Sequence, residues 1–119
     1  DQHAPDDPLF EIFPPHCIVG TPEVEVIPEL ANYPGEMIAK HRKSGFFGTT
    51  LEGKLKEMGA DKLIVCGVAT DICVLHTVAD ATFRDYAVEV PVDCVASFDE
   101  RSHEFGLEHM KRVLGVKLV

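Results

Sequence analysis

The chain has 119 residues, which is the length of a single domain. Hydrophobic residues make up 45% and charged residues 26% of it, as in an ordinary globular protein. The net charge of −9 argues against nucleic acid or an anionic membrane as the main partner, because both require clustered Lys and Arg. No apolar run approaches the roughly 20 residues of a membrane span, so a cytoplasmic protein is the simplest expectation.

The N-terminal 22 residues carry five of the eight prolines and are expected to form an ordered loop. From Thr21 to Leu30 two structures remain open. Thr21 could cap a short helix with Pro22 at its first position, whereas the alternation over residues 23–26 equally permits a strand. Met37 to Ala39 is a short apolar run that predicts a buried strand ending at Lys40.

A capping box predicts the next helix, with Thr49 at the cap and Glu52 three residues later. Its apolar stripe comprises Leu51, Leu55 and Met58, and Gly59 is expected to end it. Leu63 to Cys66 is continuously apolar and rich in β-branched residues, which is typical of a strand buried on both faces.

The second half continues the alternation of helix and strand. We expect a helix over 71–84 and a strand over 86–90. A second capping box starting at Ser97 predicts a helix that buries Leu107, Met110 and Leu114, ends at Gly115 and precedes an edge strand over 116–119. Strands alternating with helices indicate an α/β fold in three layers, α/β/α, with a mostly parallel sheet.

Cys73 lies where strand 63–66 passes into the next helix. Ligands bind beyond the carboxyl ends of parallel strands. Thr70 is a suitable helix cap, so Cys73 falls in the first turn, where the helix dipole and free backbone N–H groups stabilise a thiolate and an oxyanion. From position alone, a buried and inert cysteine is about equally plausible. Nothing favours disulfides among Cys17, Cys66, Cys73 and Cys94, so separate free thiols are expected.

Four motifs, in the same order along the chain, resemble those of one known family of enzymes. Gly67-Val68-Ala69-Thr70-Asp71-Ile72-Cys73-Val74 resembles the active-site turn of the nicotinamidase/isochorismatase-like cysteine hydrolases. Asp1-Gln2-His3 resembles the Asp-x-His of this family, and Phe13-Pro14-Pro15-His16-Cys17 resembles its Pro-Pro-His-Cys segment. Lys40 with Ser44-Gly45-Phe46 resembles its lysine and the loop that follows, and Asp93 fits as well. The resemblance implies the isochorismatase-like, Rossmann-like version of the α/β fold.

The resemblance implies catalytic roles for Cys73, Lys40 and Ala69. Cys73 matches the nucleophile that attacks an amide carbonyl, and Lys40 matches the lysine beside it. A solvated strand-end lysine is the ordinary alternative for Lys40. A cis peptide between Val68 and Ala69 is implied too, with the N–H groups of Ala69 and Cys73 as the oxyanion hole.

The resemblance also implies a metal and a substrate site. Asp1, His3 and His16 match the ligands of a divalent metal ion, with Zn²⁺ favoured and Mn²⁺ or Fe²⁺ possible; surface histidines in a loop are the alternative. Phe13 and Phe46 or Phe47 would wall a flat substrate ring, together with Val68 and Ala69, and core packing competes for all three phenylalanines. His76, His103 and His109 are expected to be structural or exposed.

Departures from the family pattern limit this interpretation. Asp6 and Asp7 stand where some nicotinamidases have a further His, and Lys43 and Ile72 where some carry Tyr and His. The triad Asp of the family has no counterpart, so we expect residues 1–119 to be the C-terminal two-thirds of one hydrolase domain.

Three functions follow from these motifs. The first is hydrolysis of the small amide nicotinamide to nicotinate and ammonia. For this function we expect a homo-oligomer with no partner other than its small-molecule substrate. The second is hydrolysis of another small amide or an N-carbamoyl compound. The third is a non-catalytic, metal- or ligand-binding relative.

Overall fold

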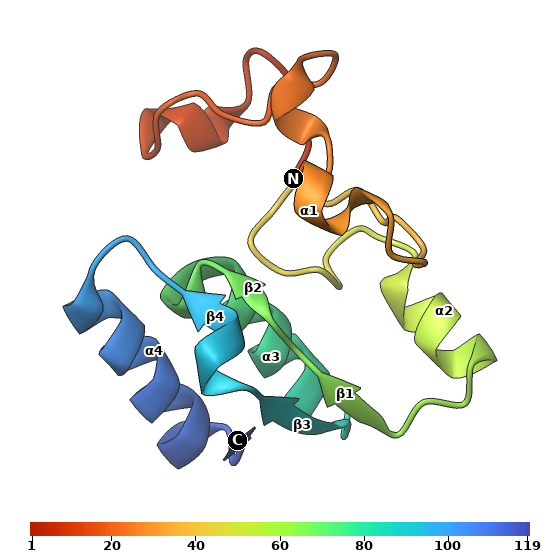
Figure 1. Cartoon of the computed structure of the whole chain (residues 1–119), viewed down its shortest axis with the longest axis vertical. Helices are drawn as coiled ribbons and strands as arrows, with labels where there is room; N and C mark the ends of the chain where they lie inside the picture. Colours follow the sequence, from red (N-terminus) through yellow and green to blue (C-terminus); the bar gives the residue numbers. More distant parts are fainter.

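Five short parallel strands form two small sheets in the computed structural model, which describes all residues 1–119. The three-stranded sheet has the order β1-β3-β5, from Lys62–Ile64, Ala87–Val90 and Lys117–Leu118. The second sheet pairs β2 (Gly67–Val68) with β4 (Val95–Ala96). Figure 1 shows α3 (Leu75–Thr82) and α4 (Glu100–Val113) connecting these strands. The predicted α/β fold with a parallel sheet is confirmed.

The core lies between the strands and these two helices. Val88 and Val90 of β3 are buried, as are Val78 on α3 and Met110 on α4. Because side chains alternate along a strand, the other face of β3 carries Glu89, which forms ion pairs with lysines of the two neighbouring strands. Leu107 and Leu114 pack against the core as predicted, and Gly115 follows α4 with a positive φ of 68°.

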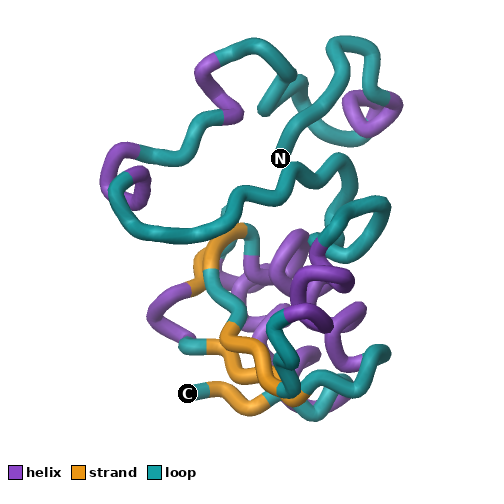
Figure 2. The backbone as a smooth tube through the Cα atoms, turned by 90° about the vertical axis from the view of Figure 1, so that its right-hand side faces the viewer, coloured by secondary structure: helices purple, strands orange, loops and turns teal.

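The N-terminal half has little regular structure, as its prolines predict, and Figure 2 shows it as loops beside the helices and strands. It contains 3-10 turns at Pro8–Glu11 and Pro22–Val24, the four-residue α1 (Pro28–Ala31) and α2 (Leu51–Glu57). The turn at Pro22 has Thr21 at its cap, so the helical alternative for this segment is right in type but much shorter than expected. No helix of the chain combines the length and apolar character needed to cross a bilayer.

Two strand predictions were wrong in detail. Residues 37–39 form no strand, because the backbone finds no ladder partner there and only the Gln2 N–H donates to the Lys40 carbonyl. Ile64 of β1 is 65% exposed, since it points to the sheet face opposite Leu63, which packs on the core. Met58 is also exposed, at the end of α2.

Neither capping box forms as predicted. Thr50 is at the cap of α2, and Glu52 pairs with Lys56 and Arg84 rather than turning back to the helix start. Asp99 caps α4 by accepting a hydrogen bond from the Ser102 N–H, while Ser97 donates to Asp71. In each case a tertiary partner competes for the side chain that the local pattern assigned to capping.

Candidate active site

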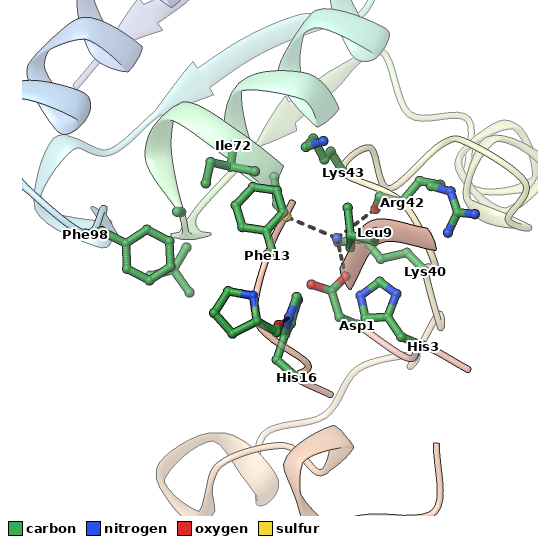
Figure 3. A pocket seen from close by; sticks show the side chains of 14 residues that line it. Asp1, His3, Leu9, Phe13, His16, Lys40, Arg42, Lys43, Ile72 and Phe98 are labelled. Atoms are coloured by element: carbon green, nitrogen blue, oxygen red, sulfur yellow. Dashed lines mark hydrogen bonds and ion pairs between the residues drawn. The ribbon is translucent and has the colours of Figure 1, made fainter. Parts of the chain in front are cut away.

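A cavity of about 360 Å³ opens beyond the carboxyl ends of β2 and β4 (Figure 3). Four segments far apart in the sequence line it. They are the proline-rich N-terminal loop, the stretch after residue 39, the end of β2 with the turn into α3, and the loop between β4 and α4; the lining residues are Asp1, His3, Leu9, Phe13, Pro14, His16, Lys40, Arg42, Lys43, Val68, Ala69, Ile72, Cys73 and Phe98. The fold thus brings the four sequence motifs to one place.

Lys40 lies at the centre of the polar contacts in this cavity. Its ammonium Nζ is 3.2 Å from the Cys73 Sγ and donates to the Arg42 carbonyl at 2.9 Å. It also forms an ion pair with the Asp1 carboxylate. Thiol, ammonium and carboxylate therefore lie in a row, an arrangement that stabilises a thiolate by an adjacent positive charge.

Helix α4 packs against the turn that carries Cys73. This turn is π-helical, spans Thr70–Val74 and leads directly into α3. Thr70 is fully buried and hydrogen-bonds His103 of α4 at 2.9 Å instead of capping the helix as predicted. The predicted cis peptide between Val68 and Ala69 is confirmed.

Gly106 lets α4 approach this turn closely. A Cβ at this position would lie 3.1 Å from the Asp71 Cα and the Asp71 N. A side chain at that distance would require the backbone of the turn or of α4 to shift by a few tenths of an ångström, so Gly106 is the residue that allows α4 to pack this closely on the turn that presents Cys73.

Asp1, His3 and His16 form a group with the chemistry of a metal site. One ligand atom from each lies within 4.8 Å of the others. The His3 Nε2 is buried and has no hydrogen-bond partner, which is costly for a polar atom unless a ligand satisfies it. The His16 Nδ1 is 2.7 Å from the Pro14 carbonyl, which leaves Nε2 as its free nitrogen. These residues therefore fit a divalent ion.

Asp7 supports this group and was not recognised as important from the sequence. Its carboxylate contacts the ring of the fully buried His3 at 3.2 Å. The Leu9 N–H and then the His3 and Arg42 contacts hold the pKa of the Asp7 carboxyl below its usual range. Burial lowers the pKa of His3 despite Asp7, which favours the neutral imidazole that binds metals.

The predicted substrate contacts divide into two sets. Phe13, Val68 and Ala69 line the cavity as expected. Phe46 does not: it is 5% exposed and packs in the core against Tyr86, so its core alternative is the right one. Phe47 is exposed outside the cavity, and Phe98 supplies the second aromatic wall, which no sequence signal had indicated.

Comparison with known proteins agrees with this geometry. Residues 1–118 match the family described as Isochorismatase domain. The chain is 36% identical to the isochorismatase family protein PncA of Bacillus subtilis, over 99% of this chain and 67% of that protein. It is 35% identical to Nicotinamidase 1 of Arabidopsis thaliana, over 90% of this chain but only 48% of that protein, so it spans about half to two-thirds of these relatives.

Three solved structures are similar throughout the chain. The nicotinamidase PncA from Bacillus subtilis has a TM-score of 0.90 at 35% identity, covering 99% of this chain and 71% of that one. N-carbamoylsarcosine amidase from Thermoplasma acidophilum has a TM-score of 0.88 at 38% identity, covering 99% and 67%. The pyrazinamidase of Pyrococcus horikoshii in complex with zinc has a TM-score of 0.78 at 32% identity, covering 89% and 62%.

Proposed function

The chain belongs to the isochorismatase family, and we propose that within it the chain acts as a cysteine amidohydrolase that converts nicotinamide to nicotinate and ammonia. The contact that carries this proposal is the one between the Cys73 Sγ and the Lys40 Nζ, at 3.2 Å in the wall of the cavity. The similarity to nicotinamidases of known structure supports the same substrate.

The proposed reaction uses Cys73 as the nucleophile. Its thiolate, stabilised by the Lys40 ammonium, attacks the amide carbonyl, and the N–H groups of Ala69 and Cys73 hold the oxyanion. Lys40 gives a proton to the departing nitrogen as the C–N bond breaks, and ammonia leaves behind a thioester. Water then attacks the thioester and gives up two protons, one to Lys40 and one to the solvent, as the C–S bond breaks and nicotinate and the thiolate are released.

Asp1 is the carboxylate beside Lys40, with which it forms an ion pair. The same residue would hold a metal together with His3 and His16. A bound divalent ion, Zn²⁺ in our proposal with Mn²⁺ and Fe²⁺ as alternatives, would supply a Lewis acid for the ring nitrogen of the substrate. Phe13 and Phe98 would then face the ring, with Val68 and Ala69 beside the amide.

Release of ammonia from nicotinamide tests this function. We expect turnover in the wild-type protein, loss of turnover in Cys73→Ala, and loss of affinity after treatment with a chelator. Cys66→Ala is the matched control, since Cys66 is an exposed thiol outside the cavity. Turnover by Cys73→Ala near the wild-type rate would overturn the assignment of the nucleophile.

A second candidate function rests on Lys43 and Ile72, which line the cavity. The Lys43 ammonium lies 5.4 Å from the Phe13 ring centroid and forms no ion pair within the chain. A small amide with a carboxylate, such as an N-carbamoyl amino acid, would supply the missing negative charge. Faster turnover of N-carbamoylsarcosine than of nicotinamide, lost in Lys43→Met, would favour this function.

Absence of turnover with either amide, combined with intact metal binding, would favour the non-catalytic alternative. That residues 1–119 belong to one domain, and that the protein is a cytoplasmic homo-oligomer, remain predictions. Exposed apolar side chains outside the cavity, such as Ile64, Phe83 and Phe105, support the prediction of association.

A further inference from the structure

Asp7 is a buried carboxylate in a loop whose neighbouring acid, Asp6, is exposed. Only 8% of Asp7 is accessible to solvent. Its Oδ1 accepts the Leu9 N–H at 2.9 Å, while its Oδ2 lies 3.2 Å from the His3 Nδ1 and 3.0 Å from the Arg42 Nη1. Both oxygens are therefore engaged, by three donors from different parts of the chain.

The contact with Asp7 determines which nitrogen of His3 carries the proton. An ionised carboxylate can only accept hydrogen bonds, so the neutral ring must donate from Nδ1. The lone pair of His3 is then on Nε2, which is buried, has no partner, and belongs to the group with Asp1 and His16. His16 has the same arrangement, since its Nδ1 contacts the Pro14 carbonyl.

We propose that Asp7, itself held by Arg42, is a positioning residue that fixes the tautomer and orientation of His3 for metal binding. The inference rests on the metal site of the proposed function, but not on its substrate. Partners of this kind, one hydrogen bond behind a ligating imidazole, typically change metal affinity 10- to 100-fold when removed.

Capping of the short turn at Pro8–Glu11 does not by itself explain why the Asp7 carboxylate also contacts His3 and Arg42. The cap is made by Oδ1 alone, through the Leu9 N–H. The second oxygen faces His3 and Arg42, neither of which belongs to that turn. Capping requires only the oxygen that accepts the Leu9 N–H. It does not require the second oxygen to contact the buried His3 ring and the Arg42 guanidinium.

Asp7→Asn separates the two roles. The amide oxygen can keep the Leu9 N–H, while the amide NH₂ faces both His3 and Arg42. The half-exposed Arg42, which can only donate, then turns to solvent, and the His3 Nδ1 has to accept. The proton then moves to Nε2, where it blocks metal binding, as in enzymes where the same exchange behind a catalytic His traps the wrong tautomer. Asp6→Asn makes the same change of charge one residue away on an exposed side chain and is the matched control.

The experiment titrates the metal-free proteins with Co²⁺ alone and follows its visible absorption, with circular dichroism to verify the fold. We expect Asp6→Asn to bind as tightly as the wild type and Asp7→Asn to bind about 10- to 100-fold more weakly. Equal affinity in Asp7→Asn and the wild type would overturn the proposal, and so would an equal loss in both variants. No amide is present, so a wrong substrate assignment would leave this result unchanged.

Nitrogen NMR of the His3 ring provides a second measurement that a merely structural role would not affect. At one alkaline pH and without metal, the wild-type ring should carry its proton on Nδ1, and the ring in Asp7→Asn on Nε2. If Asp7→Asn folds poorly, Arg42→Met offers a milder test, because Arg42 is 46% exposed. It should weaken Co²⁺ binding less than Asp7→Asn does, and unchanged affinity in Arg42→Met would remove Arg42 from the proposal.

Discussion

Lys40 is the residue on which the chemistry of the cavity depends most directly. Its ammonium Nζ lies 3.2 Å from the Cys73 Sγ, and an adjacent positive charge is a common feature of reactive cysteines. Lys43 provides a natural comparison, because it lines the same cavity without a hydrogen bond to the thiol.

We therefore predict that Lys40→Met slows the alkylation of Cys73 by iodoacetamide by at least about tenfold. Lys43→Met should leave the rate close to that of the wild type. Peptide mapping over time measures each thiol separately. In the wild type Cys73 should be labelled before Cys66, although Cys66 is the more exposed of the two. Equal labelling of these thiols would contradict an activated Cys73.

At the scale of single residues, the site residues that belong to sequence motifs could be predicted. Cys73, Lys40, Asp1, His3 and His16 all reach one cavity. Asp7 was passed over because two adjacent aspartates look alike in a sequence, and only the fold buries one and exposes the other. Phe46 was assigned to the cavity for the same reason, because it stands beside the exposed Phe47 and only the fold buries it in the core.

At the scale of elements, Gly106 shows how helix packing determines the site. Gly→Ala normally stabilises a helix by about 0.8–1.0 kcal/mol. We predict this gain for Gly53→Ala in α2, where an added Cβ meets nothing. Gly106→Ala should instead displace α4 from the Cys73 turn, since its Cβ meets backbone at 3.1 Å.

The expected result for Gly106→Ala is a fall in kcat, smaller than the roughly 100-fold that a 1 Å misplacement can cost, because the backbone has to shift by only a few tenths of an ångström. Thermal melts and ammonia release, measured for both glycine variants, test whether the close approach of α4 affects stability and activity. If Gly106→Ala were as active and as stabilised as Gly53→Ala, close approach of α4 would not matter to the site.

Glu89 joins all three strands of the larger sheet. Its two oxygens each accept from one lysine at 2.9 Å, Lys117 on β5 and Lys62 on β1. The hydrogen bonds from Lys117 and then Lys62 hold the pKa of Glu89 below its usual range. A depressed carboxyl pKa stabilises the fold above the unfolded value, about 4.3, and this contribution is lost as the pH falls through the folded pKa.

Glu89→Gln should accordingly lower the urea midpoint at pH 7, and the difference from the wild type should shrink as the pH falls below about 4. Glu104→Gln, a change at an exposed glutamate without an ion pair, should have no such effect. A Glu89→Gln difference that persisted unchanged in acid would show that the ion pairs are not its cause.

The elements that depend on local signals were largely predictable, and those that depend on partners were not. Gly59 and Gly115 follow their helices with positive φ, and β3 and β5 lie where apolar runs indicated. Residues 37–39 have the composition of a strand but no neighbour to pair with. Thr70 and Ser97 have the composition of caps, yet each bonds a residue more than 25 positions away.

At the scale of the whole molecule, the class of fold and the location of the site followed from the alternation of strands and helices. The sequence could not show how little of the chain is buried. Only 14 of 119 residues are, and nearly all of the apolar ones belong to the C-terminal half. The cavity is lined by residues of both halves of the chain, and Figure 2 shows that one of these halves is made mostly of loops.

The bond from the Gln2 N–H to the Lys40 carbonyl is one of the few backbone links that hold the N-terminal segment in place. Such a segment can detach while the core stays folded, so its amide hydrogens should exchange with deuterium long before those of β3 and α4. Zn²⁺ bound by Asp1, His3 and His16 would tie both ends of the loop together and slow exchange at Val19, which donates to the His3 carbonyl. Exchange at Val19 that is equally fast with and without Zn²⁺ would contradict this. Occupancy of the site would then govern the local stability of the N-terminal loop as well as the chemistry of the cavity.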